Sequence, residues 1–401
     1  MNIRRDTALL GTFVAVLGYS YINIVCNCVI TSVIGTNSVD TLLQLAVTIG
    51  FAFASLWGLH FQIPKDVFFA GLVLGLIIGY TALFYPVNYS YMSSHVGEIL
   101  FAFSAYVVVR CVNDVEMIKK GLKIITYFAF TSGIFLAFTM NGMFYIDGGE
   151  GVGYMVYGYK MLPAAVLSFY FYGDTKQNRY LFMTVISAIC ILMFGSRGAL
   201  ISFLCFVTLK FLFIDEERNA KKIMIALFAL VVVLVLTNES VILLLNEKLS
   251  AVFGYNSRTL ELFIGGSIND DSGRDILREL GYEMIKDHWV FGAGPYADRT
   301  IVHPWLGTGN YIHNFILEIT IAFGIPLAAF ILYKIIKPVL LAAFKYTGSD
   351  RDIVLIFFSL WFWGNMFSDT FWTNPFFYAT IAMSYTLKVK NRKNRYEEVV
   401  A

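Results

Sequence analysis

Long apolar runs separated by short polar segments extend along almost the whole chain. A bilayer core about 30 Å thick requires about 20 apolar residues per helix. On this criterion the sequence predicts about twelve transmembrane helices, near residues 8–30, 39–58, 66–86, 95–113, 121–140, 155–173, 179–195, 198–214, 221–237, 311–333, 352–368 and 373–388. We therefore expect an all-α, polytopic integral membrane protein whose residues 1–401 form a single multi-pass membrane domain.

The composition agrees with this pattern. Hydrophobic residues make up 58% of the chain and charged residues 14%, with a mean hydropathy of +0.67. These values exclude an ordinary soluble domain. A net charge of +2 is too small to predict a nucleic-acid partner. All five cysteines lie in apolar runs, so the sequence predicts neither a disulfide framework nor a zinc site.

Basic residues predict the orientation of the chain in the membrane. Most of the 30 Lys and Arg residues fall in alternate connecting segments, such as the N-terminal start, residues 119–123 and the tail after residue 388. The positive-inside rule places these segments, and both termini, in the cytoplasm. The long segment 238–310 then faces outward. In a bacterium with two membranes that side is the periplasm, and the expected location is then the bacterial inner (plasma) membrane with the functional residues on the periplasmic side.

The outward segment 238–310 is too long to be a simple connection. Its residue spacing predicts helices over 240–253 and 274–285. Arg274 and Arg278 are four residues apart, so they share one face of the second helix. The other face carries the apolar residues Leu277, Leu280 and Met284. This pattern favours a helix lying over the membrane with a cationic face, although the arginines could instead pair with Asp275, Glu279 or Glu283 on a solvated surface.

A second candidate cation, Arg197, lies at a tight outward turn among small residues (Gly195, Ser196, Gly198 and Ala199). Small neighbours allow close approach of the backbone, and a guanidinium group binds phosphate oxygens in a bidentate manner. The turn is therefore a candidate phosphate-binding corner. The alternative is that Arg197 only anchors a helix end at the membrane surface. Lys160, beside another outward loop, is a further candidate cation.

His313 begins the predicted span 311–333, so we expect it at the outer membrane surface. An imidazole titrates near neutral pH and can act as a general base, although it can also serve only as an interfacial hydrogen-bonding group. Asn314 and Glu318 lie on an adjacent face and could orient a sugar or a neighbouring arginine. Asp369, at the outer end of the eleventh span, could bind an arginine, assist the base or cap a helix. His303 is a further candidate in the long outward segment.

Three features together resemble one family. They are the Ser-Arg-Gly-Ala corner after a long apolar run, the outward segment with an arginine on a helix, and the sequence HNFILEITIAFGIP that starts at His313. Together they resemble the O-antigen polymerase (Wzy) and O-antigen ligase (WaaL) superfamily. The resemblance covers residues 195–326, with support from Ser368 and Asp369. The first half of the chain matches only as generic spans.

The resemblance implies specific roles. The family's essential arginine and histidine correspond to Arg274 and His313, and a second family arginine corresponds to Arg197. Some polymerases carry an arginine followed by ten residues and a glycine, but neither Arg274 nor Arg278 has a glycine at that spacing. The implied substrate is an undecaprenyl diphosphate-linked oligosaccharide in the membrane lipid. A chain-length regulator would be a further partner protein.

The implied reaction moves the glycan from undecaprenyl diphosphate onto the terminal sugar of another lipid-linked repeat unit. The residues Arg197 and Arg274, with Lys160 or Arg278, would stabilise the charge of the diphosphate leaving group. His313 would accept the proton of the acceptor hydroxyl. We expect no metal or other cofactor, because a neutralised diphosphate is already a competent leaving group. Direct in-line attack would invert the anomeric carbon.

Three other functions compete with a polymerase. A ligase would transfer the glycan to lipid A–core, and the SRGAL and HNFILE sequence forms favour the polymerase over it. A polysaccharide or lipid transporter is expected to show charged or broken helices at mid-membrane, or an internal repeat. A structural or sensory membrane protein would leave the outward cations and His313 without a common role.

Overall fold

The computed structural model describes residues 3–34, 63–140, 154–194, 197–214, 239–253, 257, 260, 274–306 and 311–400. Every regular element among these residues is helical. The chain divides into two compact units, which are described separately. Unit 1 comprises Met1–Phe61 and Asp114–Asn269, and unit 2 comprises Gln62–Asn113 and Asp270–Ala401.

Unit 1 is built around α7. Its elements are α1 (Ile3–Ile34), α6 (Val115–Met140), α7 (Tyr154–Thr175), α8 (Asn178–Phe194), α9 (Arg197–Leu209) with a π-helical extension (Lys210–Ile214), and α11 (Glu239–Phe253). Helix α7 packs against α6, α8 and α9, and α1 packs against α6. The side chains of Tyr157, Met161 and Phe171 on α7 are fully buried. Helix α7 is therefore the centre of this unit.

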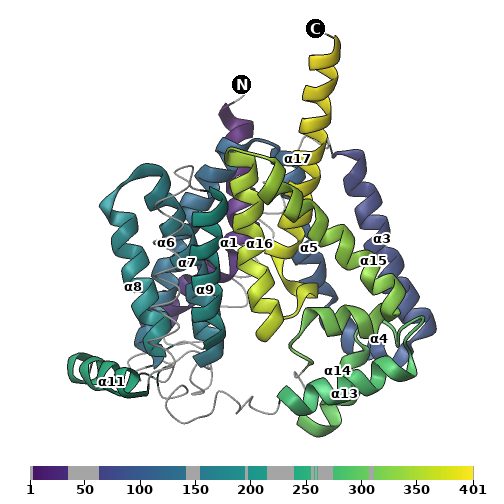
Figure 1. Ribbon diagram of the computed structural model, residues 1–401, viewed down its shortest axis with the longest axis horizontal. Helices are drawn as coiled ribbons and strands as arrows, with labels where there is room; N and C mark the ends of the chain where they lie inside the picture. The colour runs from purple at the N-terminus through teal and green to yellow at the C-terminus, as the bar shows by residue number, and fades with distance from the viewer. Residues whose placement is uncertain are drawn as a thin grey trace. The chain divides into compact units, whose positions relative to one another are not determined.

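Unit 2 is built around α16 and α17. Its elements are α3 (Lys65–Phe84), α4 (Pro86–Ser93), α5 (Val96–Val112), α13 (Arg274–Asp287), α14 (Ala297–Leu306), α15 (Phe315–Lys345), α16 (Ser349–Phe367), a 3-10 turn η2 (Phe371–Thr373) and α17 (Pro375–Val400). Helix α17 packs against α5, α15 and α16. The short helices α4, α13 and α14 gather at one end of α15 (Figure 1).

The helices confirm the all-α prediction. Predicted spans 39–58 and 221–237 lie outside the described residues, and each of the others coincides with a helix. Among the described residues, four helices are long and apolar enough to cross a membrane: α1, α3, α6 and α15. A fifth span results if α4 and α5, which bend by 72° at their junction, are counted together. Helix α15 extends to Lys345, beyond the predicted end at residue 333.

Both helices predicted in the outward segment are present, as α11 and α13. The apolar stripe of α13 forms a small core because Leu277 is buried with Ala297, Val302 and Ile312, and Met284 packs against this group. Helices α4 and α14 were not predicted. Asn88 on α4 is buried and donates a hydrogen bond of 2.9 Å to the carbonyl oxygen of Ala293. This bond ties α4 to the turn before α14.

Helix α15 is broken at Gly324, which has φ 72° and ψ 165°. The break exposes main-chain groups, and the turn 289–294 supplies their partners. The Ala293 N–H donates to the carbonyl of Ile321 at 2.7 Å, and the Ile325 N–H donates to the carbonyl of Trp289 at 2.7 Å. A buried backbone group needs such a partner. The turn is thereby fixed to α15, and it carries the chain directly into the pocket described next.

Candidate functional site

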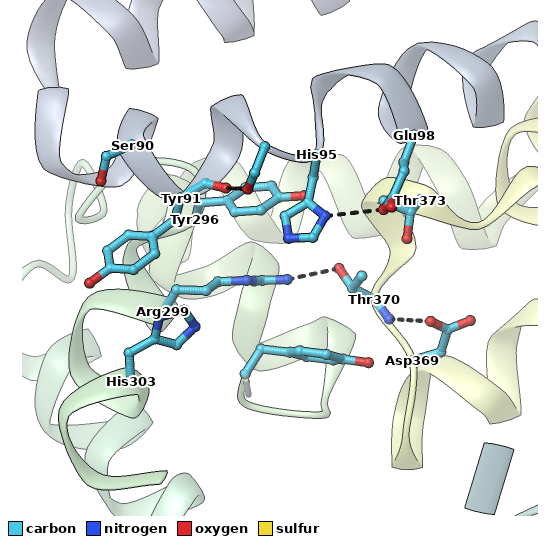
Figure 2. A pocket seen from close by; sticks show the side chains of 12 residues that line it. Ser90, Tyr91, His95, Glu98, Tyr296, Arg299, His303, Asp369, Thr370 and Thr373 are labelled. Carbon is cyan, nitrogen blue, oxygen red and sulfur yellow. Dashed lines mark hydrogen bonds and ion pairs between the residues drawn. The ribbon is translucent and has the colours of Figure 1, made fainter. Parts of the chain in front are cut away.

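Unit 2 contains a pocket of about 400 Å³. Four parts of the chain form it: the junction of α4 and α5, the helix α14 with the residue before it, the segment that precedes α15, and the segment that follows α16 (Figure 2). Its lining residues are Ser90, Tyr91, Ser94, His95, Glu98, Tyr296, Arg299, His303, Tyr311, Asp369, Thr370 and Thr373. The lining combines aromatic rings with hydroxyl groups and a few ionisable groups, which is typical of a pocket for a small polar ligand.

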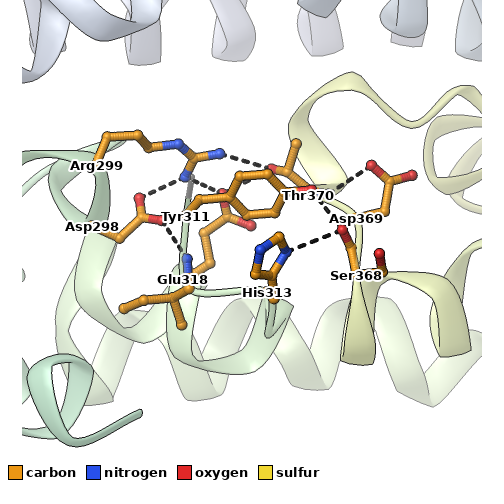
Figure 3. A network of polar contacts seen from close by, with 9 residues as sticks. Asp298, Arg299, Tyr311, His313, Glu318, Ser368, Asp369 and Thr370 are labelled. Atoms are coloured by element: carbon orange, nitrogen blue, oxygen red, sulfur yellow. Dashed lines mark hydrogen bonds and ion pairs between the residues drawn. The ribbon is translucent and has the colours of Figure 1, made fainter. Parts of the chain in front are cut away.

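Arg299 links the parts of the chain that form this pocket. Only 6% of its surface is exposed. One guanidinium nitrogen lies 2.5 Å from a carboxylate oxygen of Asp298 and 2.5 Å from one of Glu318. The other terminal nitrogen donates to the hydroxyl of Thr370 at 3.3 Å, and that hydroxyl donates to Glu318 at 2.8 Å (Figure 3). The network joins α14, α15 and the segment after α16.

Two aromatic rings flank the same guanidinium group. Its carbon lies 4.3 Å from the ring centroid of Tyr296 and 4.9 Å from that of Tyr311. Burial opposes the charge of Arg299, but attraction from Asp298 and Glu318 outweighs burial, so the pKa of Arg299 lies above its ordinary value. Burial also raises the pKa of both tyrosine phenols. The guanidinium group therefore stays charged and the phenols stay neutral through the physiological pH range.

The positive charge of Arg299 is neutralised by carboxylates inside the protein. Asp298 and Glu318 are both almost fully buried, and both bind it directly. An arginine that already has two carboxylate partners offers little net positive charge to a phosphate group. The pocket is consequently better suited to hydroxyl groups and apolar ring faces than to a diphosphate.

His313 lies beside the pocket without lining it. Its Nδ1 is 3.1 Å from the carbonyl oxygen of Ser368, so this nitrogen donates the hydrogen bond. The phenol of Tyr311 donates to the same carbonyl at 2.7 Å, and the two rings pack with centroids 4.3 Å apart. His313 also has a left-handed backbone, with φ 52°. The histidine is thus held against Tyr311, which itself lines the cavity.

Other predicted residues do line the pocket. Asp369 accepts hydrogen bonds from the Thr370 N–H at 2.9 Å and from the Asn374 side chain at 3.2 Å. His303 packs edge-on against Tyr91, with ring centroids 4.5 Å apart. The structure therefore brings Asp369 and His303 to one site, as part of the pocket wall.

Several predicted residues have other partners. Glu318 was expected to orient a sugar or a neighbouring arginine, and the structure shows the second role, because Glu318 is buried against Arg299. Arg278 pairs with Asp275 at 2.9 Å on a partly exposed surface, which is the alternative to phosphate binding that its sequence left open. The side chain of Arg274 lies outside the described residues.

The two cations predicted from the first part of the chain belong to unit 1. Lys160 donates a hydrogen bond from α7 to the hydroxyl of Ser20 on α1. Arg197 begins α9, and its side chain lies outside the described residues. Their role in holding a diphosphate stays a prediction.

Asn314 was expected to contact substrate, but it caps α15 instead. Its side-chain oxygen accepts hydrogen bonds of 3.1 Å from the N–H groups of Ile316 and Leu317. Replacing Asn314 by Ala should lower the free energy of unfolding by about 1 kcal/mol, because those N–H groups lose their acceptor. Thermal unfolding of the purified protein in detergent measures this, with the exposed Thr320→Ala on the same helix as the control. A loss of transfer activity without a loss of stability would instead support substrate contact.

Several pocket residues were missed by the sequence analysis. Arg299 follows Asp298 directly, and an adjacent Asp-Arg pair in a sequence usually predicts a solvent-exposed ion pair. Its burial becomes evident only from the contacts with Glu318 and Thr370, which are distant in sequence. His95 and Glu98 lie at the start of a predicted span, where the sequence analysis assigned them no role. The spacing His-x-x-Glu at a helix start was the available signal, because residues three apart face each other on a helix.

Comparison with known proteins gives a match to a family model, and it covers the middle and later part of the chain. No curated protein matches the chain, and no solved structure matches it. The family described as O-antigen ligase (Wzy_C) matches residues 182–332. That segment includes α14 and four residues that line one side of the pocket: Tyr296, Arg299, His303 and Tyr311. With its several apolar helices, the chain is an integral membrane protein that carries an O-antigen ligase (Wzy_C) family domain at residues 182–332, consistent with the Wzy and WaaL superfamily that its sequence resembles.

Proposed function

We propose that the protein is an O-antigen or capsular polysaccharide polymerase. In this proposal it has about twelve membrane spans, cytoplasmic termini and a periplasmic loop over residues 238–310, and lies in the inner membrane. It transfers a glycan from undecaprenyl diphosphate onto the terminal sugar of another lipid-linked repeat unit, and the pocket in unit 2 receives that acceptor sugar.

The lining of the pocket carries this proposal. Tyr91 and Tyr311 offer aromatic surface for the apolar face of a sugar ring. Hydroxyl groups, including those of Ser94 and Thr373, line the same cavity as hydrogen-bonding partners for sugar hydroxyls. The residues between Tyr296 and Tyr311 belong to the segment that matches the O-antigen ligase family. A sugar-binding pocket in a glycan-transfer family favours the acceptor as its ligand.

The diphosphate requires cations other than Arg299, whose charge Asp298 and Glu318 already neutralise. Arg274 begins α13, and Arg278 lies one turn further along the same helix. We assign Arg274 and Arg197, with either Lys160 or Arg278, to the diphosphate. Their role is to stabilise the negative charge that grows on the leaving group as the glycosidic bond breaks. The transfer requires no metal in this scheme.

The reaction is a single displacement. The acceptor hydroxyl oxygen attacks the anomeric carbon of the donor sugar and loses its proton to a histidine. The bond between that carbon and the diphosphate breaks, and its electron pair leaves with undecaprenyl diphosphate. Direct attack inverts the anomeric configuration, which product analysis by NMR will report.

A ligase is the second candidate, because the matched family is described as O-antigen ligase. A ligase and a polymerase carry out the same bond exchange with different acceptors. Incubation of the purified protein with defined lipid-diphosphate repeats, with and without lipid A–core, separates them. Laddered products without core indicate a polymerase, and products formed only with core indicate a ligase.

The same assay tests the assigned cation and the predicted base. Arg274→Ala and His313→Ala should each reduce the elongation rate about 100-fold, a size typical for the loss of a group that stabilises charge or supports proton transfer. Lys286→Ala removes an exposed cation from the other end of α13 and should leave the rate unchanged. Normal elongation by Arg274→Ala and His313→Ala together would contradict an enzymatic role for both residues.

A further inference from the structure

His95 stands at the sharp junction between α4 and α5, where the two helices bend by 72°. Its Nδ1 lies 3.1 Å from Oε2 of Glu98, one helical turn further along α5. Because a carboxylate only accepts, this contact places the proton of a neutral imidazole on Nδ1. The other ring nitrogen, Nε2, then carries the lone pair. This is the arrangement of a histidine base oriented by a carboxylate.

The lone pair of His95 is available in the pocket. Both His95 and Glu98 line the cavity, and the side chain of His95 is 45% exposed. Within the described residues, no hydrogen bond to Nε2 is present. Figure 2 shows the imidazole above the guanidinium group of Arg299, with its second nitrogen turned to that side of the pocket. The ring also stacks on Tyr296, with centroids 6.2 Å apart. A sugar between these groups would meet Nε2 directly.

His313 has a different environment. Its Nδ1 binds the carbonyl of Ser368, and its ring packs on the face of Tyr311, outside the cavity lining. A general base must come within hydrogen-bonding distance of the proton that it removes. From its observed place His313 fixes Tyr311 and the segment after α16, and so shapes the pocket without entering it.

We propose that His95, oriented by Glu98, is the base that accepts the proton of the acceptor hydroxyl, and that His313 is a positioning residue. This rests on the proposed function. As the oxygen attacks the anomeric carbon, its proton moves to Nε2 of His95, and the bond to the diphosphate breaks with its electron pair on the leaving group. Glu98 stabilises the resulting imidazolium. The base then comes from a part of the chain outside the O-antigen ligase match at residues 182–332.

The charges around His95 determine how the rate should depend on pH. Glu98 on α5 faces His95. Arg299, whose charge Asp298 and Glu318 neutralise, and His303 face the cavity from α14. Asp369 faces the cavity from the segment after α16. The phenols of Tyr296 and Tyr311, whose pKa burial raises, are neutral lining groups. A base must be deprotonated to act, so the elongation rate should fall on the acidic side of its pH profile.

The test compares four purified proteins in the elongation assay across pH: the wild type, His95→Asn, Glu98→Gln and His288→Asn. Asn is a favourable residue at the start of a helix, so His95→Asn should preserve α5. His288 is exposed at the end of α13, outside the pocket, and supplies the matched control. His313→Asn is measured in parallel to separate positioning from proton transfer.

We expect His95→Asn to lower the elongation rate about 100-fold. The rate that remains should no longer decrease at acidic pH, and this decrease in the wild type is called the acidic fall below. Glu98→Gln should move that fall to lower pH, because the carboxylate no longer stabilises the imidazolium. His313→Asn should lower the rate but keep the fall, and His288→Asn should match the wild type. If His95→Asn does not fold, the shift in Glu98→Gln decides the question.

The inference is overturned if the wild type elongates glycans and His95→Asn behaves like His288→Asn. It is also overturned if Glu98→Gln leaves the pH profile unchanged, or if His313→Asn, and not His95→Asn, removes the acidic fall. A wild-type protein that elongates no glycan at any pH, with or without core acceptor, contradicts the proposed function itself. Failure of the His95 assignment and failure of the proposed function therefore give different results.

Discussion

Replacing Arg299 by Met should destabilise unit 2 by about 3–5 kcal/mol, because it leaves buried carboxylates without their cation. Asp298 is 1% exposed and Glu318 is 3% exposed, and both lie against the guanidinium group. Neither carboxylate can reach water when the arginine is removed. The unfolding midpoint in detergent measures the effect, and the elongation rate should fall with it, because Tyr296, Tyr311 and Thr370 lose their common support.

Two further variants test the cause. Arg278→Met removes a guanidinium group whose partner Asp275 is largely exposed, and should cost less than about 1 kcal/mol. The triple variant Arg299→Met, Asp298→Asn and Glu318→Gln should recover much of the lost stability, because it removes the uncompensated charges together with the arginine. If Arg299→Met is as stable as Arg278→Met, the network does not support the pocket.

The helices themselves could be predicted because their signal is local. The apolar runs gave the all-α fold, and the spacing of Leu277, Leu280 and Met284 gave a helix that the structure places at Arg274–Asp287. Each of these predictions depends on residues within a few turns of one another. Hydrophobic periodicity is informative over that range. The short helices α4 and α14 were missed, because α4 has only eight residues and α14 has ten residues with Pro304 inside it, a residue that normally ends a helix.

The site could be predicted only in part, because its contacts join distant residues. His303 and Asp369 were selected as polar groups near a predicted membrane surface, and both line the pocket. Arg299 escaped notice because its burial depends on Glu318 and Thr370, which are far away in sequence. Asn314 was assigned to substrate although a helix cap is the common role of an Asn before an apolar run. Sequence spacing alone does not distinguish these cases.

The break in α15 illustrates the same limit. Gly324 and Pro326 lie in the run that was read as one continuous span, and together they are a recognised signal for a kink. Proline has no N–H group, so the carbonyl of Ala322 loses its helical partner. The structure supplies the Gly294 N–H instead, at 3.2 Å. The kink could have been predicted, but its partner in the turn 289–294 could not.

Replacing Gly324 by Ala should therefore detach that turn from α15, at a cost of about 3 kcal/mol or more in stability. Gly324 has φ 72° and ψ 165°, a conformation that is essentially restricted to glycine. A Cβ atom there would also lie 2.3 Å from the carbonyl oxygen of Val290. That carbonyl belongs to the turn itself, so the two main chains would have to separate. The hydrogen bonds from Ala293 and to Trp289 would then be lost.

Gly348→Ala is the matched control. Gly348 has a similar φ of 82°, but a Cβ atom there would have no neighbour within 4 Å. This variant should cost only the backbone strain, about 1–2 kcal/mol. The unfolding midpoint and the rate of protease cleavage near residues 289–294 should both change more in Gly324→Ala. Because the turn leads directly to Tyr296 and Arg299, elongation should fall as well. Equal effects of the two substitutions would mean that backbone strain alone, and not the contact with the turn, accounts for the role of Gly324.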